Sequence, residues 1–274
     1  RKETGMKIAF IGGGNMAEGM IAAVRRRRLA ETGDIVVAEP QPCRRQLLIK
    51  KYRLRVVEDA RDAVPDASLV VLAIKPQDLG GVLADLKDRL APGQLLLSVV
   101  AGATLDALRG GHGAVVRAMP NINARGGTAV TLWTATSGVT PAQRETAAAF
   151  LGTLGHQLYT PDEKYLDMAT ALSGSGPAYV FLFIEALTDA GVHIGLPRTM
   201  AADLAVYTVS GSAALAVKTG APPAQLREMV VSPGGTTAEA LLRLEEGGFR
   251  GLITRAVVAA YEKSQGLGGK AKGG

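Results

Sequence analysis

The chain has 274 residues, of which 47% are hydrophobic and 20% charged, so it is long enough for two ordinary domains and too hydrophobic to be a disordered tail. Its net charge is +6, but aromatic residues make up only 4%, which argues against binding of single-stranded nucleic acid by base stacking. The four consecutive arginines at 25–28 lie at the end of an expected helix, where cations complement the helix dipole. We favour this role over a nucleic-acid patch.

The single cysteine, Cys43, excludes an internal disulfide. No stretch approaches the roughly 20 uninterrupted apolar residues that a membrane helix needs. The first residues, RKETG, lack the apolar core of a signal peptide, so we take Met6 as the natural start. We expect a cytoplasmic protein without membrane or nucleic-acid partners.

Short apolar runs alternate with helical patterns over the first 120 residues. The expected strands are residues 7–12, 34–40, 68–76, 94–100 and 114–120. The expected helices are residues 15–28, 42–52, 79–90 and 104–109. This alternation predicts a parallel sheet with helices on both faces, an α/β fold of the doubly wound Rossmann type.

After about residue 160 the strand signals stop. The expected helices there are residues 162–174, 175–196, 198–219, 223–230, 236–246 and 251–266. The helix at 175–196 lacks a clearly polar face, so we expect it to be buried, either in this chain or in a partner subunit. The sequence therefore predicts a sheet domain at 6–160 and an all-α domain at 161–268.

The stretch FIGGGNMA contains a G-x-G-x-x-A pattern at Gly12, Gly14 and Ala17. The first glycine makes a tight turn, the second lets a pyrophosphate approach the backbone, and the small third residue lets helix and strand pack closely. The pattern follows an expected strand and opens an expected helix, whose N-terminal N–H groups would face the phosphates. We therefore expect a dinucleotide site here.

The second expected strand carries Glu39 near its end. An acidic residue there accepts hydrogen bonds from a ribose 2′-hydroxyl and repels a 2′-phosphate, which favours NAD. Arg44 and Arg45 follow closely and could hold a phosphate, or could lie on an exposed helix face. The sequence leaves NADH and NADPH both open as cofactors.

Two further strand ends are candidate nicotinamide contacts, because ligands bind at the carboxyl ends of parallel strands. One carries Lys75 and Pro76, and the other carries residues 119–121. The alternative for both is that these residues only end their strands and contact no ligand.

The residues offer no metal site and no strong general acid or base. His112, His156 and His193 lack metal-ligand spacing, and no Ser-His-Asp arrangement or carboxylate pair stands out. A hydride-transfer enzyme of this kind suits a protonated cyclic imine, which accepts hydride with positioning and mild hydrogen bonding.

The stretch SPGGTT at 232–237 lies at the start of an expected helix. On local pattern alone it is an N-capped helix with a tight turn, or an anion site made by free N–H groups.

Six motifs in order resemble the pyrroline-5-carboxylate reductase family. They are FIGGGNMA, AIKPQ, SVVAG, RAMPN, LSGSGPAYVFLFIEALTDAGVHIGLPR and VSPGGTTAEALLRLEEGGFRGLI, within about residues 6 to 266. The resemblance implies reduction of 1-pyrroline-5-carboxylate to L-proline with NADPH or NADH, the last step of proline synthesis. It also implies that the all-α domain is a dimerisation domain, with active sites at the interface of a homodimer, and that some members form a homodecamer.

The resemblance assigns site residues to matching positions. Thr237, near the imine nitrogen, and Lys75 are the catalytic candidates. Substrate contacts are expected from Glu163, Ser173, Gly174, Ser175, Gly176, Ser232, Gly234, Gly235, Thr236 and Thr237. Cofactor contacts are expected from Gly12, Gly13, Gly14, Asn15, Met16, Ala17, Glu39, Arg44, Ala73, Lys75, Pro76, Ala101, Gly102 and Asn121. The backbone N–H groups at 234–237 would bind the substrate carboxylate.

The chain departs from the family pattern M-P-N-T-P, where it has Ile122 and Asn123, and it has Ala221 and Pro222 where Glu-His is common. Two alternative functions stay open on the sequence. One is a hydroxyacid or coenzyme-F420-linked dehydrogenase, of which the hydroxyacid enzyme should carry a catalytic Lys or His on the helical domain. The other is a non-catalytic dinucleotide-binding protein.

Overall fold

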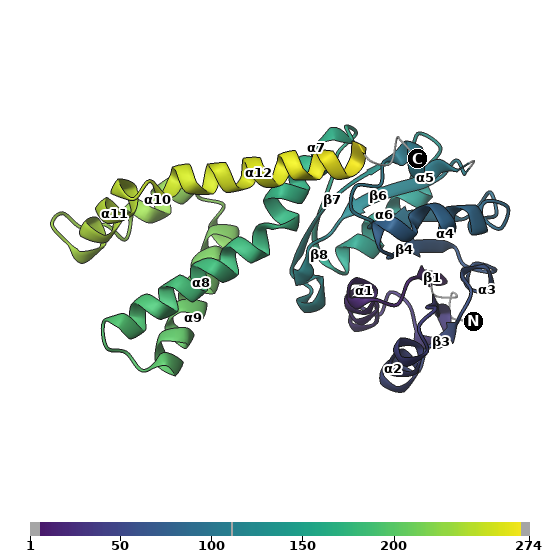
Figure 1. Cartoon of the computed structure of the whole chain (residues 1–274), viewed down its shortest axis with the longest axis horizontal. Coiled ribbons are helices and arrows are strands. Elements are labelled where there is room, and N and C mark those ends of the chain that lie inside the picture. Colours follow the sequence, from purple (N-terminus) through teal and green to yellow (C-terminus); the bar gives the residue numbers. More distant parts are fainter. Residues whose placement is uncertain (1–5, 111, 270–274) are drawn as a thin grey trace. The chain divides into compact units, whose positions relative to one another are not determined.

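The computed structural model describes residues 6–110 and 112–269 (Figure 1). Residues 1–5, which we take to precede the natural start, lie outside the described part. The chain divides into two compact units. The described residues of the first unit run to Ser175 and resume at Ala260, and the second unit is Gly176–Ala259.

The first unit is built on a sheet of eight strands in the order β3-β2-β1-β4-β5-β6-β7-β8. The strands are β1 Ile8–Ile11, β2 Ile35–Ala38, β3 Arg55–Val57, β4 Leu69–Leu72, β5 Leu95–Ser98, β6 Val115–Met119, β7 Ala129–Ala135 and β8 Gly155–Tyr159. All neighbours are parallel except β6 and β7. The five predicted strands are confirmed as β1, β2, β4, β5 and β6, whereas β3, β7 and β8 were not predicted.

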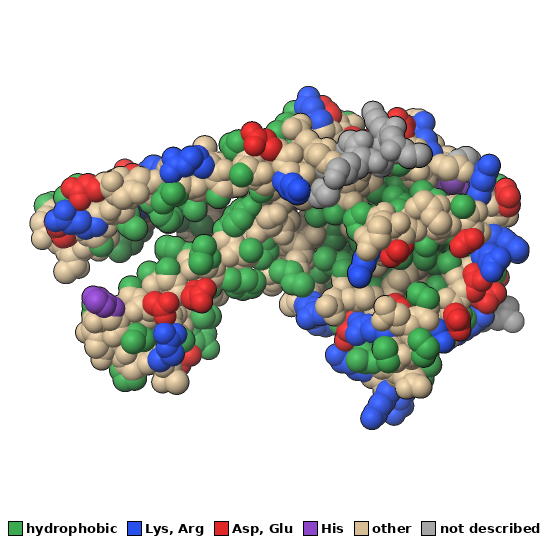
Figure 2. Space-filling view, viewed as in Figure 1, with side chains coloured by type: hydrophobic (Ala, Val, Ile, Leu, Met, Phe, Trp, Pro, Cys, Tyr) green, Lys and Arg blue, Asp and Glu red, His purple; other side chains and the backbone are tan. Residues whose placement is uncertain are grey.

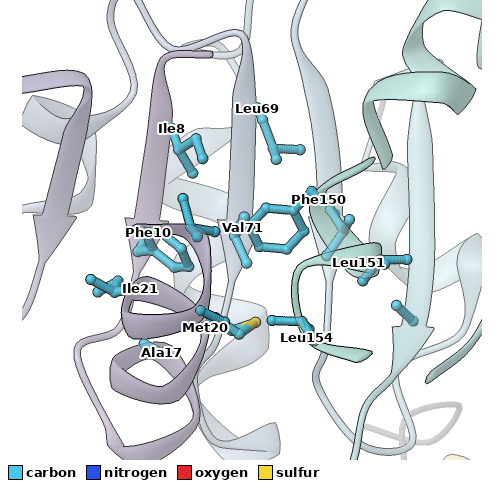
Figure 3. Packing of buried hydrophobic residues seen from close by; sticks show 14 of the residues in the cluster. Ile8, Phe10, Ala17, Met20, Ile21, Leu69, Val71, Phe150, Leu151 and Leu154 are labelled. Carbon is cyan, nitrogen blue, oxygen red and sulfur yellow. The ribbon is translucent and has the colours of Figure 1, made fainter. Parts of the chain in front are cut away.

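Helices cover both faces of this sheet, as predicted. They are α1 Asn15–Arg26, α2 Pro42–Tyr52, α3 Ala60–Ala63, α4 Leu79–Leu86, α5 Leu105–Arg109, α6 Pro141–Gly152 and α7 Lys164–Ala169. Successive strand residues point to opposite faces. Phe10 therefore packs with α1, α2 and α6, while its neighbour Ala9 packs with α3, α4 and α5. Figure 3 shows the buried residues on the Phe10 side of the sheet. The ring centroids of Phe10 and Phe150 lie 6.1 Å apart there.

Helix α1 shows how the sequence sets up this packing. Ala17, Met20, Ile21 and Val24 recur at helical spacing and are fully buried against the sheet. Arginines occupy its last turn, where they complement the helix dipole as expected. The helix N-terminus is thereby held directly after β1.

Residues 161–175 belong to the first unit because they pack on its sheet. Arg117 of β6 pairs with Glu163 and Asp167 at the start and within α7. A π-helical turn, Thr170–Gly174, follows α7. The boundary between the compact units therefore falls at Ser175, later in the chain than the expected domain boundary at residue 160. The domain bounds 6–160 and 161–268 stay predictions.

The second unit is helical throughout, without a strand in its described residues. It contains α8 Gly176–His193, α9 Arg198–Thr219, α10 Pro223–Glu228, α11 Thr236–Glu246 and the first part of α12 Phe249–Gly269. Helices α8 and α9 lie side by side, and an added Cβ on Gly191 would stand 2.9 Å from the Ala201 side chain (Figure 1). The glycine therefore permits this close approach.

Helix α8 leaves most of its large apolar residues exposed within this chain. Phe181 is 58% exposed and Leu182 is 66% exposed. Hydrophobic side chains also lie at the surface of the second unit in Figure 2. The sequence predicted burial of this helix either in its own chain or in a partner subunit, and the exposure within its own chain favours the partner subunit.

Two helical stretches, Lys164–His193 and Arg198–Thr219, are long and apolar enough to cross a membrane by length and composition alone. The sequence criterion of an uninterrupted apolar run missed them, because charged residues interrupt both. The absence of a membrane partner stays a prediction.

Candidate active site

A pocket of about 700 Å³ lies in the first unit at the carboxyl ends of β1, β2 and β4. Its lining residues are Gly12, Gly14, Asn15, Glu39, Pro40, Gln41, Arg44, Ala73, Ile74, Lys75, Gln77 and Asp78. β1 lies between β2 and β4, so the chain reverses its direction of winding here. Ligands of open α/β sheets bind at such a switch point, outside the strand ends.

In the loop after β1, each of the three glycines is explained by a different steric environment. Gly12 has φ of +95°, and an added Cβ would stand 2.6 Å from the Ala73 carbonyl oxygen. At Gly13 an added Cβ would stand 2.7 Å from Leu48 Cδ1. At Gly14 an added Cβ would meet no protein atom within 4 Å, and this residue precedes α1 as its N-cap. The protein fills the space at the first two glycines and leaves the pocket open at the third.

Of the remaining loop residues predicted to contact cofactor, Asn15 lines the pocket. Met16 is half-buried against the core, and Ala17 is fully buried. The backbone N–H groups of these three residues lie in the first turn of α1, where an anion is favoured by the unpaired donors and the helix dipole.

Glu39 lines the pocket and also anchors the glycine loop. It is 7% exposed. Its Oε2 accepts a hydrogen bond from Gly13 N at 2.9 Å, and its Oε1 accepts one from Gln41 N at 2.9 Å. The carboxylate is therefore held at the pocket wall, just after the end of β2, by two backbone donors.

The two arginines after Glu39 have different positions. Arg44 lines the pocket, donates from Nε to the Gly13 carbonyl at 2.6 Å, and pairs through Nη2 with Glu18 at 2.5 Å. Arg45 donates instead to the carbonyls of Glu39 and Pro40 and pairs with Glu58. Arg44 is thus the arginine that faces the cofactor pocket.

Glu18 of α1 joins this cluster without touching the pocket. It accepts hydrogen bonds from Arg44, from Lys51 at 2.7 Å and from Tyr52 at 3.0 Å. Partial burial acts to raise the pKa of Glu18, but the hydrogen bonds from Lys51, Arg44 and Tyr52 outweigh it and lower the pKa to about 2. Glu18 is therefore ionised at neutral pH.

The strand-end residues after β4 form the other side of the pocket. Ala73 and Lys75 line it as predicted, while Pro76 begins a 3₁₀ turn, Pro76–Asp78, whose next two residues line the pocket instead. Lys75 is exposed and makes no ion pair with the described part of the chain. Ala101 and Gly102 follow β5 and do not line this pocket.

Asn121, the predicted contact after β6, holds two loops together. Its Nδ2 donates to the Ser173 carbonyl at 3.0 Å, and its Oδ1 accepts from Asn123 N at 3.3 Å. Ile122, which departs from the family pattern, is 42% exposed. The side-chain amide of Asn121 thus links the strand end to the segment that carries the predicted substrate contacts.

Glu163 Oε1 accepts two hydrogen bonds from the described part of the chain. Oε1 accepts from Arg117 Nη1 at 2.8 Å and from Leu105 N at 2.8 Å. Arg117 also donates to Asp167 at 2.7 Å and is itself only 5% exposed. One buried guanidinium therefore fixes the segment before the π-helical turn.

The π-helical turn carries the next predicted contacts. Ser173 Oγ donates to the Ala169 carbonyl at 2.9 Å, and Ser175 N donates to the Thr170 carbonyl at 2.8 Å. An added Cβ on Gly174 would stand 3.3 Å from Met119 Cε. Single π-helical turns occur frequently at functional sites. Gly176, the last of this group, begins α8 in the second unit.

The remaining predicted contacts lie in the second unit at the start of α11. Ser232 accepts from Gly235 N at 3.0 Å through its carbonyl, and Gly234 has φ of +69°. The N-cap residue of α11 is Gly235, which has no side chain to accept a capping hydrogen bond. The first intrahelical bond begins at Glu239 N, so the N–H groups of Thr236, Thr237 and Ala238 precede it. These are the donors that an anion would use.

Some pocket residues were not predicted. Gln41, Gln77 and Asp78 stand just after strand ends that we had identified, so a wider window after each strand would have included them. Glu18 and Arg117 carry no such signal, because their partners lie on distant segments.

Comparison with known proteins covers nearly the whole chain. Residues 163–267 match the family model for pyrroline-5-carboxylate reductase dimerisation, and residues 7–102 match the model for NADP oxidoreductase, coenzyme F420-dependent. A pyrroline-5-carboxylate reductase of Synechocystis sp. is 42% identical over 97% of this chain and 99% of its own length. The chain belongs to the pyrroline-5-carboxylate reductase family.

Solved structures of this family have the same fold. The reductase from Coxiella burnetii superposes with a TM-score of 0.89 at 33% identity, covering 96% of this chain and 98% of that one. The pyrroline carboxylate reductase from Plasmodium falciparum, solved with NADP bound, gives 0.86 at 31% identity, with coverage of 96% and 98%. These findings confirm the family resemblance, the Rossmann sheet followed by a dimerisation domain, and an NAD(P)H-dependent oxidoreductase.

Proposed function

We propose that this chain reduces 1-pyrroline-5-carboxylate to L-proline with NADPH or NADH. The observation that carries the proposal is the near full-length identity with pyrroline-5-carboxylate reductases, together with the dinucleotide pocket at the strand ends. The coenzyme-F420 family model covers only residues 7–102, so it describes the nucleotide-binding half. The helical half matches the reductase model, which favours this function over the other dehydrogenases.

The residues of the pocket fit a nicotinamide dinucleotide. Gly14 leaves the space that a pyrophosphate needs beside the first turn of α1. Glu39 and Arg44 line one side of the pocket and would meet the ribose, and Ala73 and Lys75 line the other side. When bound in this pocket, a reduced nicotinamide would supply a hydride, with its electron pair, for the imine carbon, and the protonated imine nitrogen would take the former π pair to become the amine of proline.

The proposed substrate contacts lie on two segments, the start of α11 in the second unit and the π-helical turn in the first unit. The N–H groups at 236–238 and the positive end of the helix dipole would bind the substrate carboxylate. Thr237 Oγ1 would accept a hydrogen bond from the protonated imine nitrogen, and Lys75 would lie on the nicotinamide side. Glu163 and the 173–176 segment would shape the pocket. Protonation of the imine before hydride transfer removes the need for a strong acid in the protein.

We propose a homodimer as the active assembly, formed by the helical second unit. The family model for dimerisation covers this unit and supports self-association. The decamer formed by some family members, and a cytoplasmic location, remain predictions.

An absorbance assay with 1-pyrroline-5-carboxylate and NADPH or NADH tests the function. We expect substrate-dependent loss of the reduced nicotinamide signal and formation of proline. If the nucleotides bind but no proline forms with either, the chain is a dinucleotide-binding protein of another role.

Replacement Thr237→Ala tests the substrate site. We expect kcat to fall about 10- to 100-fold, the effect of losing a hydrogen bond to a charged group, while the Kd of the nucleotide changes little. Thr146→Ala is the matched control, because the Thr146 hydroxyl donates only within α6, to the Ala142 carbonyl. Full activity in the Thr237 variant would remove that residue from the mechanism.

A further inference from the structure

The ribose end of the cofactor pocket holds one facing arginine and one facing carboxylate, Arg44 and Glu39. Their charges oppose each other in the choice between a 2′-hydroxyl and a 2′-phosphate. A carboxylate accepts a hydrogen bond from the hydroxyl, whereas a guanidinium grips the phosphate through two adjacent N–H groups. The preference therefore depends on whether Arg44 is free to do so.

Arg44 already uses the side edge of its guanidinium. Nε donates to the Gly13 carbonyl at 2.6 Å, and Nη2 pairs with Glu18 at 2.5 Å. These two donors form the side-on fork of the guanidinium, one of its two bidentate edges, and both point toward α1 and the glycine loop. The side chain is also largely buried, with 19% of its surface exposed, so it has little freedom to turn.

Glu18 holds this arrangement from behind the pocket. Its side chain is 13% exposed and is bound by Lys51 and Tyr52 as well as by Arg44. Glu18 is also charged at neutral pH, since these hydrogen bonds lower its pKa despite partial burial. The positive charge of Arg44 is therefore paired before a nucleotide arrives.

Glu39 has no such ionic partner in the described chain. Its two oxygens accept backbone N–H groups of Gly13 and Gln41, which orient the carboxylate without neutralising it. Each oxygen retains capacity to accept a ribose hydroxyl. Arg45, the other nearby cation, is turned toward backbone carbonyls and Glu58.

We propose that Glu18 is a positioning residue that sets nucleotide preference: by holding Arg44 against the glycine loop, it leaves Glu39 as the charge that the adenosine ribose meets, and the enzyme prefers NADH to NADPH. The proposal rests on the proposed function only in taking this pocket as the nucleotide site. Neither Glu18 nor its contact with Arg44 belongs to the predicted cofactor residues.

The first measurement compares the wild-type protein with the two nucleotides. We expect the Kd from calorimetry, and kcat/KM in the proline-forming assay, to favour NADH by about 10-fold or more. A wild-type preference for NADPH would overturn the proposal. Because the binding constants need no turnover, nucleotide binding without proline formation would refute the proposed function and leave this test intact.

The second measurement uses Glu18→Gln, which keeps the shape of the side chain and removes its charge. We expect the affinity ratio of NADPH to NADH to rise about 10-fold, because Arg44 is released toward the pocket. The matched control is Glu58→Gln, which removes the same charge from Arg45 at a carboxylate that is 74% exposed. An equal rise in both variants, or an equal loss of both nucleotides in Glu18→Gln, would overturn the proposal.

The third measurement uses Arg44→Met, which stays informative even if the Glu18 variant fails to fold. In the wild-type background we expect the NADPH to NADH ratio to change less than about 2-fold, since Arg44 is already paired. In the Glu18→Gln background we expect the same replacement to remove the gain in NADPH affinity. A selective loss of NADPH binding in the wild-type background would show that Arg44 already grips the phosphate, and would overturn the proposal.

Discussion

At the scale of single residues, the glycine loop separates two reasons for having no side chain. Gly12 needs its glycine for the fold, because φ is +95° and an added Cβ would collide with the Ala73 carbonyl oxygen at 2.6 Å. Gly14 has an ordinary φ of −68° and no protein atom within 4 Å of an added Cβ. We propose that this glycine serves a ligand that approaches the backbone, as in dinucleotide sites.

Replacement by alanine should therefore affect stability at Gly12 and nucleotide binding at Gly14. Gly12→Ala should lower the free energy of unfolding by roughly 2–4 kcal/mol, from backbone strain and overpacking. Gly14→Ala should change it by less than about 1 kcal/mol and instead raise the KM for NADH and NADPH, because its methyl group enters the pyrophosphate space. Urea denaturation and steady-state kinetics measure the two effects. Equal stability losses in both variants would contradict this account of the loop.

Sequence reasoning could find the residues whose roles follow from the strand they end. Gly12, Gly14, Glu39 and Lys75 were predicted in this way and line one pocket. Glu18 was missed because it contacts Arg44 across 26 residues, on a different helix. No local pattern records which carboxylate an arginine will choose, since that depends on how α1 and α2 pack.

At the scale of elements, the missed strands differ in how visible they were. β7, Ala129–Ala135, has the alternating β-branched and aromatic pattern of a half-buried strand and could have been identified. β8, Gly155–Tyr159, reads GHQLY, pairs only with β7, and keeps most residues partly exposed. β3 has three residues and an exposed Arg55. Short edge strands bury too little apolar surface to leave a clear pattern.

Helix α7 joins the sheet through an ionic contact that hydrophobic periodicity does not reveal. Arg117 projects from β6 with 5% of its side chain exposed, whereas Glu163 and Asp167 are 30% and 28% exposed. The arginine is thus the buried charge, and the two carboxylates compensate it from the solvent side. Loss of both partners would leave that charge unpaired in the interior, which is costly.

We therefore predict that the double replacement Glu163→Gln with Asp167→Asn is more damaging than the sum of the single ones. Each single variant should lose about 1 kcal/mol of unfolding free energy, and the double variant roughly 3–5 kcal/mol. The matched control is Glu239→Gln with Glu246→Gln, which strips two carboxylates from Arg243 at an exposed site, where 68% of the arginine side chain is accessible. Urea denaturation should show small, additive losses there. Additive losses at Arg117 would contradict the prediction.

At the scale of the whole molecule, the helical unit carries more exposed apolar surface than a monomer accounts for. Exposed large hydrophobic residues occur along α8, α9, α11 and α12. They include Phe181, Leu182, Leu204, Tyr207, Val217, Leu242 and Leu252. Extensive exposed apolar surface of this kind is typical of an interface, and the dimerisation family model covers these helices.

The apolar pattern of residues 175–196 therefore predicted a helix correctly but could not locate its partner. A continuous apolar run is the same in a buried core helix and in a helix covered by another subunit. The structure separates the two cases, because α8 keeps Leu182 66% exposed within its own chain. The same exposed apolar residues also explain why the stretches that contain α8 and α9 are long and apolar enough to cross a membrane.

A single charge on this surface should separate assembly from nucleotide binding. Leu182→Asp places an unpaired carboxylate in the proposed interface, which should cost several kcal/mol of association and yield monomers in sedimentation equilibrium at micromolar protein. Proline formation should fall at least about 100-fold, because we place the active site at the dimer interface, while the Kd for NADH, whose pocket lies in the first unit, should change less than about 2-fold. Ile49→Asp, at an apolar residue of α2 that is 48% exposed, is the matched control and should leave assembly and activity intact. A monomeric Leu182 variant that still makes proline at the wild-type rate would show that each chain holds a complete site.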